Sequence, residues 1–116
     1  MMKVIIAGAA GRMGKRIAEM VDSHPGLVYG AGFEASGNPF IGSDAGEVAG
    51  LGKNGVIIGE GLESVIDQGD VIIDFTFHKA TIEFARIAAE HGRAMVIGTT
   101  GLSAEQLNEI KELSTS

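Results

Sequence analysis

The fold of this chain is decided by the stretch Val4-Ile5-Ile6-Ala7-Gly8-Ala9-Ala10-Gly11-Arg12-Met13-Gly14. The run from Val4 to Ala7 is apolar without alternation and too short for a helix, so it predicts a strand that is buried on both faces. A helix is predicted from about Arg12 to Val21, because apolar residues recur there at helical spacing, namely Met13, Ile17, Met20 and Val21. This apolar stripe is expected to face the sheet. The three glycines between strand and helix occupy the position of a dinucleotide-binding fingerprint.

Each glycine of that fingerprint has its own physical role. We expect Gly8 to allow the tight turn, Gly11 to let backbone N–H groups approach a pyrophosphate, and Gly14 to let the helix pack closely on the strand. The positive end of the helix dipole then faces the phosphates. The predicted cofactor-binding residues here are Gly8, Ala9, Ala10, Gly11, Arg12 and Met13. The alternative is a glycine-rich turn that exists for steric reasons alone.

The rest of the chain repeats the alternation of buried strand and helix. Further strands are predicted at Leu27–Phe33, Val56–Ile58, Val71–Phe75 and Ala94–Ile97. Helices are predicted near Leu62–Ile66, over Lys79–His91 with Gly92 ending it, and from Ser103, where Gln106 completes a capping box. The helix over Lys79–His91 is expected to bury Ile82, Ala85 and either Phe84 or Ile87. Residues 36–54 are expected to form a long loop in which Asp44 and Glu47 cap one helical turn.

This alternation predicts an α/β fold, a Rossmann-type doubly wound parallel sheet, as a single three-layer domain over residues 1–116. The composition agrees with a folded chain, because 45% of the 116 residues are hydrophobic and 21% are charged. The net charge of −6 disfavours nucleic acid and anionic membranes as partners. There is no cysteine and no signal-peptide or transmembrane pattern, so a cytoplasmic location is expected.

An acidic residue completes the fingerprint. Glu34 ends the second predicted strand, 20 residues after Gly14, where a carboxylate accepts hydrogen bonds from the adenosine ribose. The following Ala35 and Ser36 supply no cation for a ribose 2′-phosphate, which predicts a preference for NADH, while Arg12 leaves NADPH possible. The alternative is that Glu34 is an ordinary solvated acid at a strand end.

The second half of the sheet carries polar residues at the carboxyl ends of its strands. Parallel sheets bind ligands at this edge, so Phe75 and Thr76, together with Gly98, Thr99 and Thr100, are predicted to meet the nicotinamide end. For the glycine-threonine loop, the alternative is a plain turn with helix-capping threonines. Asp74 is left open between a structural and a site role. The three histidines have no partner at metal or triad spacing, so no metal site and no catalytic residue is predicted in this chain.

Four blocks in this order resemble dihydrodipicolinate reductase: Ala7 to Gly14, Gly42 to Glu47, Val71 to Thr76, and Val96 to Gly101. The resemblance implies an NAD(P)H-dependent oxidoreductase that reduces 4-hydroxy-tetrahydrodipicolinate, a small dicarboxylate, in the diaminopimelate route to lysine. It implies that Gly8 to Met13 cradle the pyrophosphate, Glu34 holds the ribose, and Gly98 to Thr100 meet the nicotinamide, with Thr100 also near substrate.

The family's adjacent histidines, lysine and substrate-carboxylate loop lie on a carboxyl-terminal catalytic and tetramerisation domain, and no match to them occurs in these residues. We therefore expect a chain cut at Ser116 that binds dinucleotide, lacks turnover alone, and belongs to a homotetramer when intact. The alternative is a standalone NAD-binding or redox-sensing module without catalysis.

Overall fold

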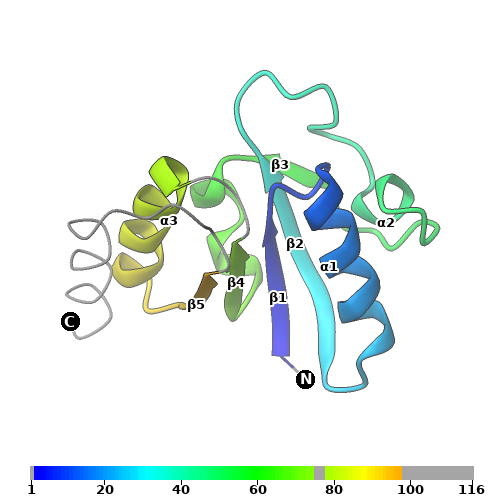
Figure 1. The fold of residues 1–116 in the computed structure, drawn as a ribbon, viewed down its shortest axis with the longest axis horizontal. Coiled ribbons are helices and arrows are strands. Elements are labelled where there is room, and N and C mark those ends of the chain that lie inside the picture. Colours follow the sequence, from blue (N-terminus) through cyan, green and yellow to red (C-terminus); the bar gives the residue numbers. More distant parts are fainter. Residues whose placement is uncertain (1, 75–77, 98–116) are drawn as a thin grey trace.

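The computed structural model describes residues 2–74 and 78–97, and these form three layers around one sheet (Figure 1). Five strands lie parallel in the order β3-β2-β1-β4-β5. Their bounds are β1 Met2–Ala7, β2 Leu27–Glu34, β3 Ile58–Glu60, β4 Val71–Asp74 and β5 Ala94–Ile97. The helices are α1 Arg12–Ser23, α2 Ala45–Val48 and α3 His78–Glu90. The predicted doubly wound parallel sheet is confirmed.

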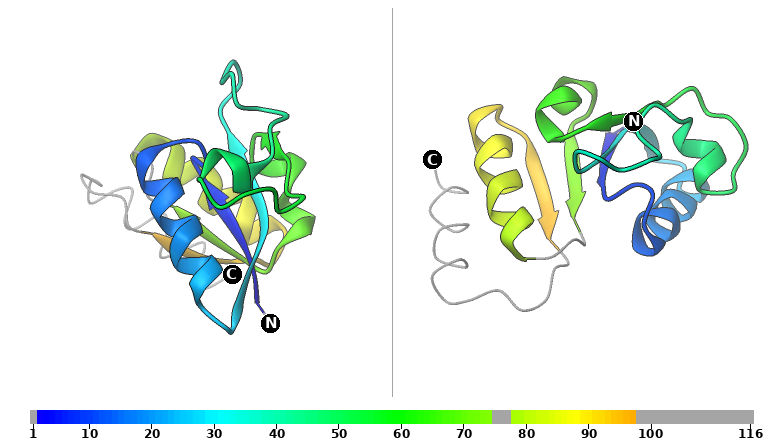
Figure 2. Two further views of the ribbon diagram at one scale, coloured as in Figure 1. Left: turned by 90° about the vertical axis from the view of Figure 1, so that its right-hand side faces the viewer. Right: turned by 90° about the horizontal axis from the view of Figure 1, so that it is seen from above.

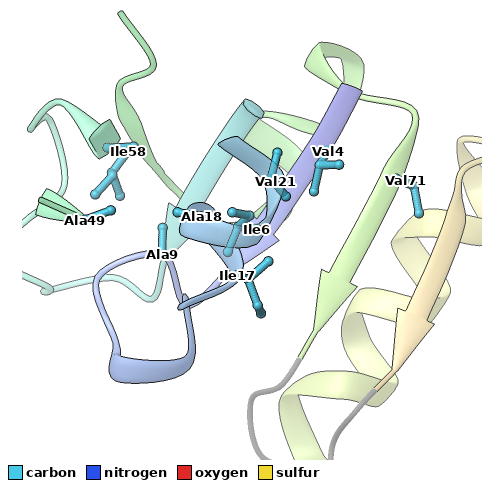
Figure 3. Packing of buried hydrophobic residues seen from close by; sticks show 10 residues of the cluster. Val4, Ile6, Ala9, Ile17, Ala18, Val21, Ala49, Ile58 and Val71 are labelled. Carbon is cyan, nitrogen blue, oxygen red and sulfur yellow. The ribbon is translucent and has the colours of Figure 1, made fainter. Parts of the chain in front are cut away.

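Strand β1 is the centre of the sheet and is buried on both sides. Val4 and Ile6 belong to the core on the α1 side, where Ile17, Ala18 and Val21 of the helix point toward them (Figure 3). Ile5 and Ala7 belong to the opposite core, which includes residues of α3. Helices α1 and α3 therefore cover opposite faces, with the sheet between them (Figure 2). The apolar run without alternation follows from this double coverage.

Helix α1 presents a different stripe from the predicted one. Its buried residues are Gly14, Ile17, Ala18 and Val21, whereas Met13 is 45% exposed and Met20 is 67% exposed. The expectation that Met13 and Met20 face the sheet is wrong. Because the helix lies very close to the start of the turn at Gly14, only small residues fit between helix and strand at that level.

The third strand starts two residues later than predicted. Ile57 lies opposite Asp44 in an antiparallel bridge, and the Ala45 N–H donates to the Val56 carbonyl. The first part of the apolar run thus pairs with the preceding loop, and only Ile58–Glu60 pairs with β2. The short helix predicted near Leu62–Ile66 is instead two 3-10 turns, η1 Leu62–Ser64 and η2 Ile66–Gln68.

The connection from β4 through α3 to β5 matches its prediction closely. Helix α3 buries Ile82, Ala85 and Ile87, and Phe84 packs edge-on against Phe33 with ring centroids 5.0 Å apart. Gly92 follows the helix with φ of +66°, a left-handed conformation that favours glycine and ends helices. The helix predicted from Ser103 lies outside the described residues. Within residues 2–74 and 78–97, no helix is both long and apolar enough to cross a membrane.

Strands β1 and β4 are neighbours, yet the helices that follow them cover opposite faces of the sheet. In doubly wound sheets, ligands bind beyond the carboxyl ends of the strands at such a switch point. The turn after β1, the end of β2 and the end of β4 all lie at that edge (Figure 1). The fold thus gathers the glycine turn, Glu34 and Asp74 at one edge of the sheet.

Candidate functional site at the glycine turn

The turn between β1 and α1 is tied to the end of β2. The N–H groups of Gly8 and Ala9 both donate to the Phe33 carbonyl, at 3.1 and 3.2 Å, and the Gly11 N–H donates to the Gly8 carbonyl at 2.9 Å. Gly8 has φ of +68°, which L side chains rarely adopt. The first glycine is therefore needed for the shape of the turn itself.

Gly14 is needed for packing. A Cβ placed on Gly14 would lie 2.2 Å from the Gly8 carbonyl oxygen and 3.0 Å from the Ala9 Cα. Both atoms are backbone and cannot rotate away. The close approach of α1 to the turn therefore requires glycine here, as the third position of the fingerprint predicts.

Gly11 differs from the other two glycines because the free protein does not need it. Its φ of −80° is accessible to any residue, and a Cβ would meet only the Gly8 oxygen, at an ordinary 3.4 Å. Gly11 is exposed and precedes α1, whose first turn has no side-chain cap and no acidic residue. An uncapped helix N-terminus with open space before it suits an anion that approaches the backbone.

Glu34 joins the end of β2 to the same turn. Its Oε2 accepts a 2.8 Å hydrogen bond from the Ala10 N–H, while Oε1 makes no hydrogen bond to the described residues. The side chain is only partly buried. The structure thus brings Glu34 and the residues Gly8 to Met13 together, with one carboxylate oxygen still able to accept. Arg12 and Met13 are exposed at the start of α1.

Asp74 lies at the end of β4, beside β5. Its side chain is fully buried and accepts a 2.6 Å hydrogen bond from the Thr81 hydroxyl, which is also fully buried. This bond joins the end of β4 to the first turn of α3, which favours the structural reading of Asp74. The predicted site residues Phe75, Thr76, Gly98, Thr99 and Thr100 lie outside the described residues.

Replacing the buried hydroxyl should weaken this connection. A Thr81→Val variant keeps the side-chain shape but removes one donor to a buried carboxyl oxygen, so we expect a loss of about 2 kcal/mol in unfolding free energy. Urea unfolding followed by circular dichroism measures it. Thr81→Ser, which keeps the hydroxyl and removes the methyl group, should lose clearly less. A Thr81→Val variant as stable as the unmodified chain would show that the hydrogen bond does not contribute.

The loop before β3 is more ordered than its composition suggested. Asp44 caps α2, as predicted, by accepting from the Glu47 N–H, and it also accepts from the N–H groups of Asn54 and Gly55. Burial alone would raise the pKa of Asp44, but these backbone donors outweigh it and hold the pKa below its ordinary value. Asn54 clamps the loop further by accepting from the N–H groups of Gly46 and Val56.

Tyr29 and Asn54 are the residues that sequence reasoning missed in this region. Tyr29 carries a buried hydroxyl on β2, and its pKa is raised above its ordinary value by burial first, then by the charges of Glu34 and Asp44. A tyrosine inside an apolar run is expected to be a core residue, and the adjacent sequence gives no sign that two acids act on it. Asn54 looks like any polar loop residue, since its partners are set by the folded loop.

The histidines serve local structure where they are described. His24 Nδ1 accepts from the Gly26 N–H in the turn before β2, and His91 Nδ1 lies 3.0 Å from the Ile87 carbonyl at the end of α3. Within the described ranges, no three His, Cys, Asp or Glu side chains gather in a way that suits a metal ion.

The chain resembles reductases and dehydrogenases of known structure. It superposes on a dipicolinate-bound dihydrodipicolinate reductase from Paenisporosarcina sp. TG-14 with a TM-score of 0.76 and 25% identity, covering 98% of this chain and 43% of that one. An amine dehydrogenase from Mycobacterium smegmatis gives a TM-score of 0.77 at 24% identity over 97% of this chain and 36% of that one. The latter likeness shows the fold alone.

Sequence comparison is more specific. The chain is 69% identical over its full 116 residues to a 4-hydroxy-tetrahydrodipicolinate reductase from Desulfotalea psychrophila, of which it spans 43%. The chain thus covers less than half the length of this relative. A family model described as the amino-terminus of dihydrodipicolinate reductase matches residues 2–116. The chain therefore belongs to the dihydrodipicolinate reductase family and corresponds to its amino-terminal part.

Proposed function

We propose that this chain is the NAD(P)H-binding part of a 4-hydroxy-tetrahydrodipicolinate reductase, an oxidoreductase of the diaminopimelate route to lysine. The observation that carries the proposal is the turn at Gly8 to Gly14, where the one glycine that the fold does not need faces an uncapped helix N-terminus. Family membership supports the same reading over a standalone sensing module. When bound, the dinucleotide supplies the hydride.

The contacts proposed at the glycine turn use groups that are available in the free protein. The N–H groups at the start of α1 bind the pyrophosphate, and Glu34 Oε1 accepts from the adenosine ribose hydroxyls. Phe75, Thr76 and Gly98 to Thr100 are proposed for the nicotinamide end, with Thr100 near substrate. Glu34 disfavours a 2′-phosphate by charge repulsion, so the proposal includes a preference for NADH over NADPH.

The whole enzyme's activity requires more than these residues. Hydride transfer needs an acceptor held close to the donor carbon and a source of the proton. Among the described residues we find no nucleophile–base pair and no group of side chains that would hold a substrate. We propose that the part of the relatives beyond this match supplies the dicarboxylate site and the tetramer interface, and that this chain alone has no turnover. A cytoplasmic location completes the proposal and fits the cysteine-free composition.

Calorimetric titration of the chain with NADH and NADPH tests the cofactor assignment. NADH should bind more tightly, and a Glu34→Ala variant should lose about ten- to hundredfold in NADH affinity, because a charged acceptor for the ribose is removed. The variant should also narrow the gap between NADH and NADPH, since it removes the repulsion of the phosphate.

A Glu19→Ala variant is the matched control. Glu19 is an exposed acid in the second half of α1, so its loss changes the net charge equally without touching the turn. Loss of either acid should if anything favour an anionic ligand through overall charge, so only a specific contact makes Glu34→Ala the weaker binder. If Glu34→Ala binds NADH as tightly as Glu19→Ala does, Glu34 does not hold the ribose.

A further inference from the structure

The hydroxyl of Tyr29 is buried without a hydrogen-bond partner among the described residues. A buried polar group without a partner costs about 1–3 kcal/mol, and phenylalanine would fill the same space without that cost. The tyrosine ring itself packs against the core on the α1 side. The hydroxyl therefore adds nothing to the packing, and its position points to a hydrogen bond that forms when a ligand is bound.

The hydroxyl lies beneath the glycine turn. A Cβ placed on Gly32 would be 2.7 Å from the Tyr29 Oη and 2.9 Å from the Ala9 Cβ, so the phenol occupies the space that a side chain at Gly32 would take. Ala9 precedes Ala10, whose N–H holds Glu34. Gly32 lies two residues before Glu34 on β2. Tyr29 thus reaches the site at the point where turn and strand meet.

The Glu34 carboxylate is held at Ala10, next to Ala9, which borders the same space as this hydroxyl, and Asp44 is the other carboxylate whose charge acts on it. Glu34 and Asp44 both raise the pKa of Tyr29 beyond the effect of burial, so the phenol stays protonated and is a donor. Asp44 already accepts from three backbone N–H groups. Among residues 2–74 and 78–97, the Ala10 N–H is the one donor to Glu34. The acceptor with remaining capacity is Glu34.

We propose that Tyr29 is a positioning residue for the adenosine ribose, whose hydroxyl donates to the Glu34 carboxylate when the dinucleotide is bound. This inference rests on the proposed function. A carboxylate has about four acceptor positions. The Ala10 N–H and the Tyr29 O–H occupy two of them and fix the orientation of the group, which leaves the other two for the two ribose hydroxyls.

A Tyr29→Phe variant separates this role from packing. It should weaken binding of both NADH and ADP-ribose about fivefold, because one hydrogen bond to a charged group is lost in the complex only. ADP-ribose carries the adenosine and pyrophosphate without nicotinamide, so an equal loss for both ligands shows that the effect does not involve the nicotinamide ring. In the absence of ligand, the urea midpoint should stay the same or rise, since an unpaired buried hydroxyl is removed.

A double-mutant cycle with Glu34→Ala tests the route of the effect. If Tyr29 acts through Glu34, Tyr29→Phe should change ADP-ribose affinity less than twofold when Glu34 is already alanine. An unchanged affinity of the single variant, an equal loss in both backgrounds, or a lowered urea midpoint that parallels the loss would each overturn the inference. Failure of the unmodified chain to bind ADP-ribose would remove the proposed function as well, which distinguishes the two failures.

Discussion

A Gly14→Ala variant should lose about 3 kcal/mol of stability, a large loss for the addition of a single methyl group. The added Cβ would lie 2.2 Å from the Gly8 carbonyl oxygen and 3.0 Å from the Ala9 Cα, so α1 must move away from the turn. Alanine normally favours a helix interior by about 1 kcal/mol over glycine, which offsets only part of the clash. Thermal unfolding should show a midpoint lowered by roughly 10 °C.

The direction of the change in unfolding midpoint distinguishes two explanations. Helix propensity alone predicts that Gly14→Ala stabilises the chain, whereas the contact with Gly8 predicts the reverse. A midpoint equal to or above that of the unmodified chain would mean that α1 does not lie as close to the turn as described. The spacing of turn and helix would then need another explanation.

A Gly11→Ala variant should weaken NADH binding while leaving the stability of the chain almost unchanged. The new Cβ meets only the Gly8 oxygen at 3.4 Å and needs no unusual φ, so unfolding free energy should change by less than about 1 kcal/mol. The methyl group intrudes on the space before α1, where the pyrophosphate must approach the backbone. Crowding of 1–3 kcal/mol corresponds to a loss of about ten- to hundredfold in NADH affinity.

Calorimetry and thermal unfolding on the same preparation check both halves of that expectation. Unchanged affinity in Gly11→Ala would place the dinucleotide away from the turn and would contradict the fingerprint reading. A large loss of stability would instead show that Gly11 is structural like Gly14. The two glycines, three residues apart, therefore serve as controls for each other.

The architecture was readable from the sequence because local signals agreed with one another. An unbroken apolar run, a glycine turn and an amphipathic helix each predict one step of the same unit, and Gly8 and Gly14 play the roles that their spacing indicates. Glu34 was found because an acid at a strand end after this motif has a fixed relation to the turn. Its bond to the Ala10 N–H was not foreseen.

The errors arose where tertiary contacts override a local pattern. Periodicity placed Met13 and Met20 on the buried stripe, but the close approach at Gly14 selects small residues and turns the methionines outward. The apolar run at Val56 looked like the start of a strand, but the loop around Asp44 pairs with it first. Neither contact has a signal in the residues nearby.

The hydroxyl of Tyr29 was missed for a related reason. The two acids whose charges act on it are Glu34 and Asp44. The end of β2 and the loop held by Asn54 bring them near Tyr29, so the residues next to Tyr29 in the sequence do not reveal them. Polar groups that matter only in a complex leave no trace in hydrophobic periodicity. They become visible when a buried donor is found next to an acceptor with spare capacity.

A backbone-amide NMR titration of the chain with NADH tests binding at the glycine turn directly. Saturable shifts should be largest for the amides of Ala10 to Gly14 and for Glu34, with smaller changes along the rest of α1. Saturable shifts confined to residues elsewhere, or no saturation at millimolar NADH, would contradict binding at the glycine turn.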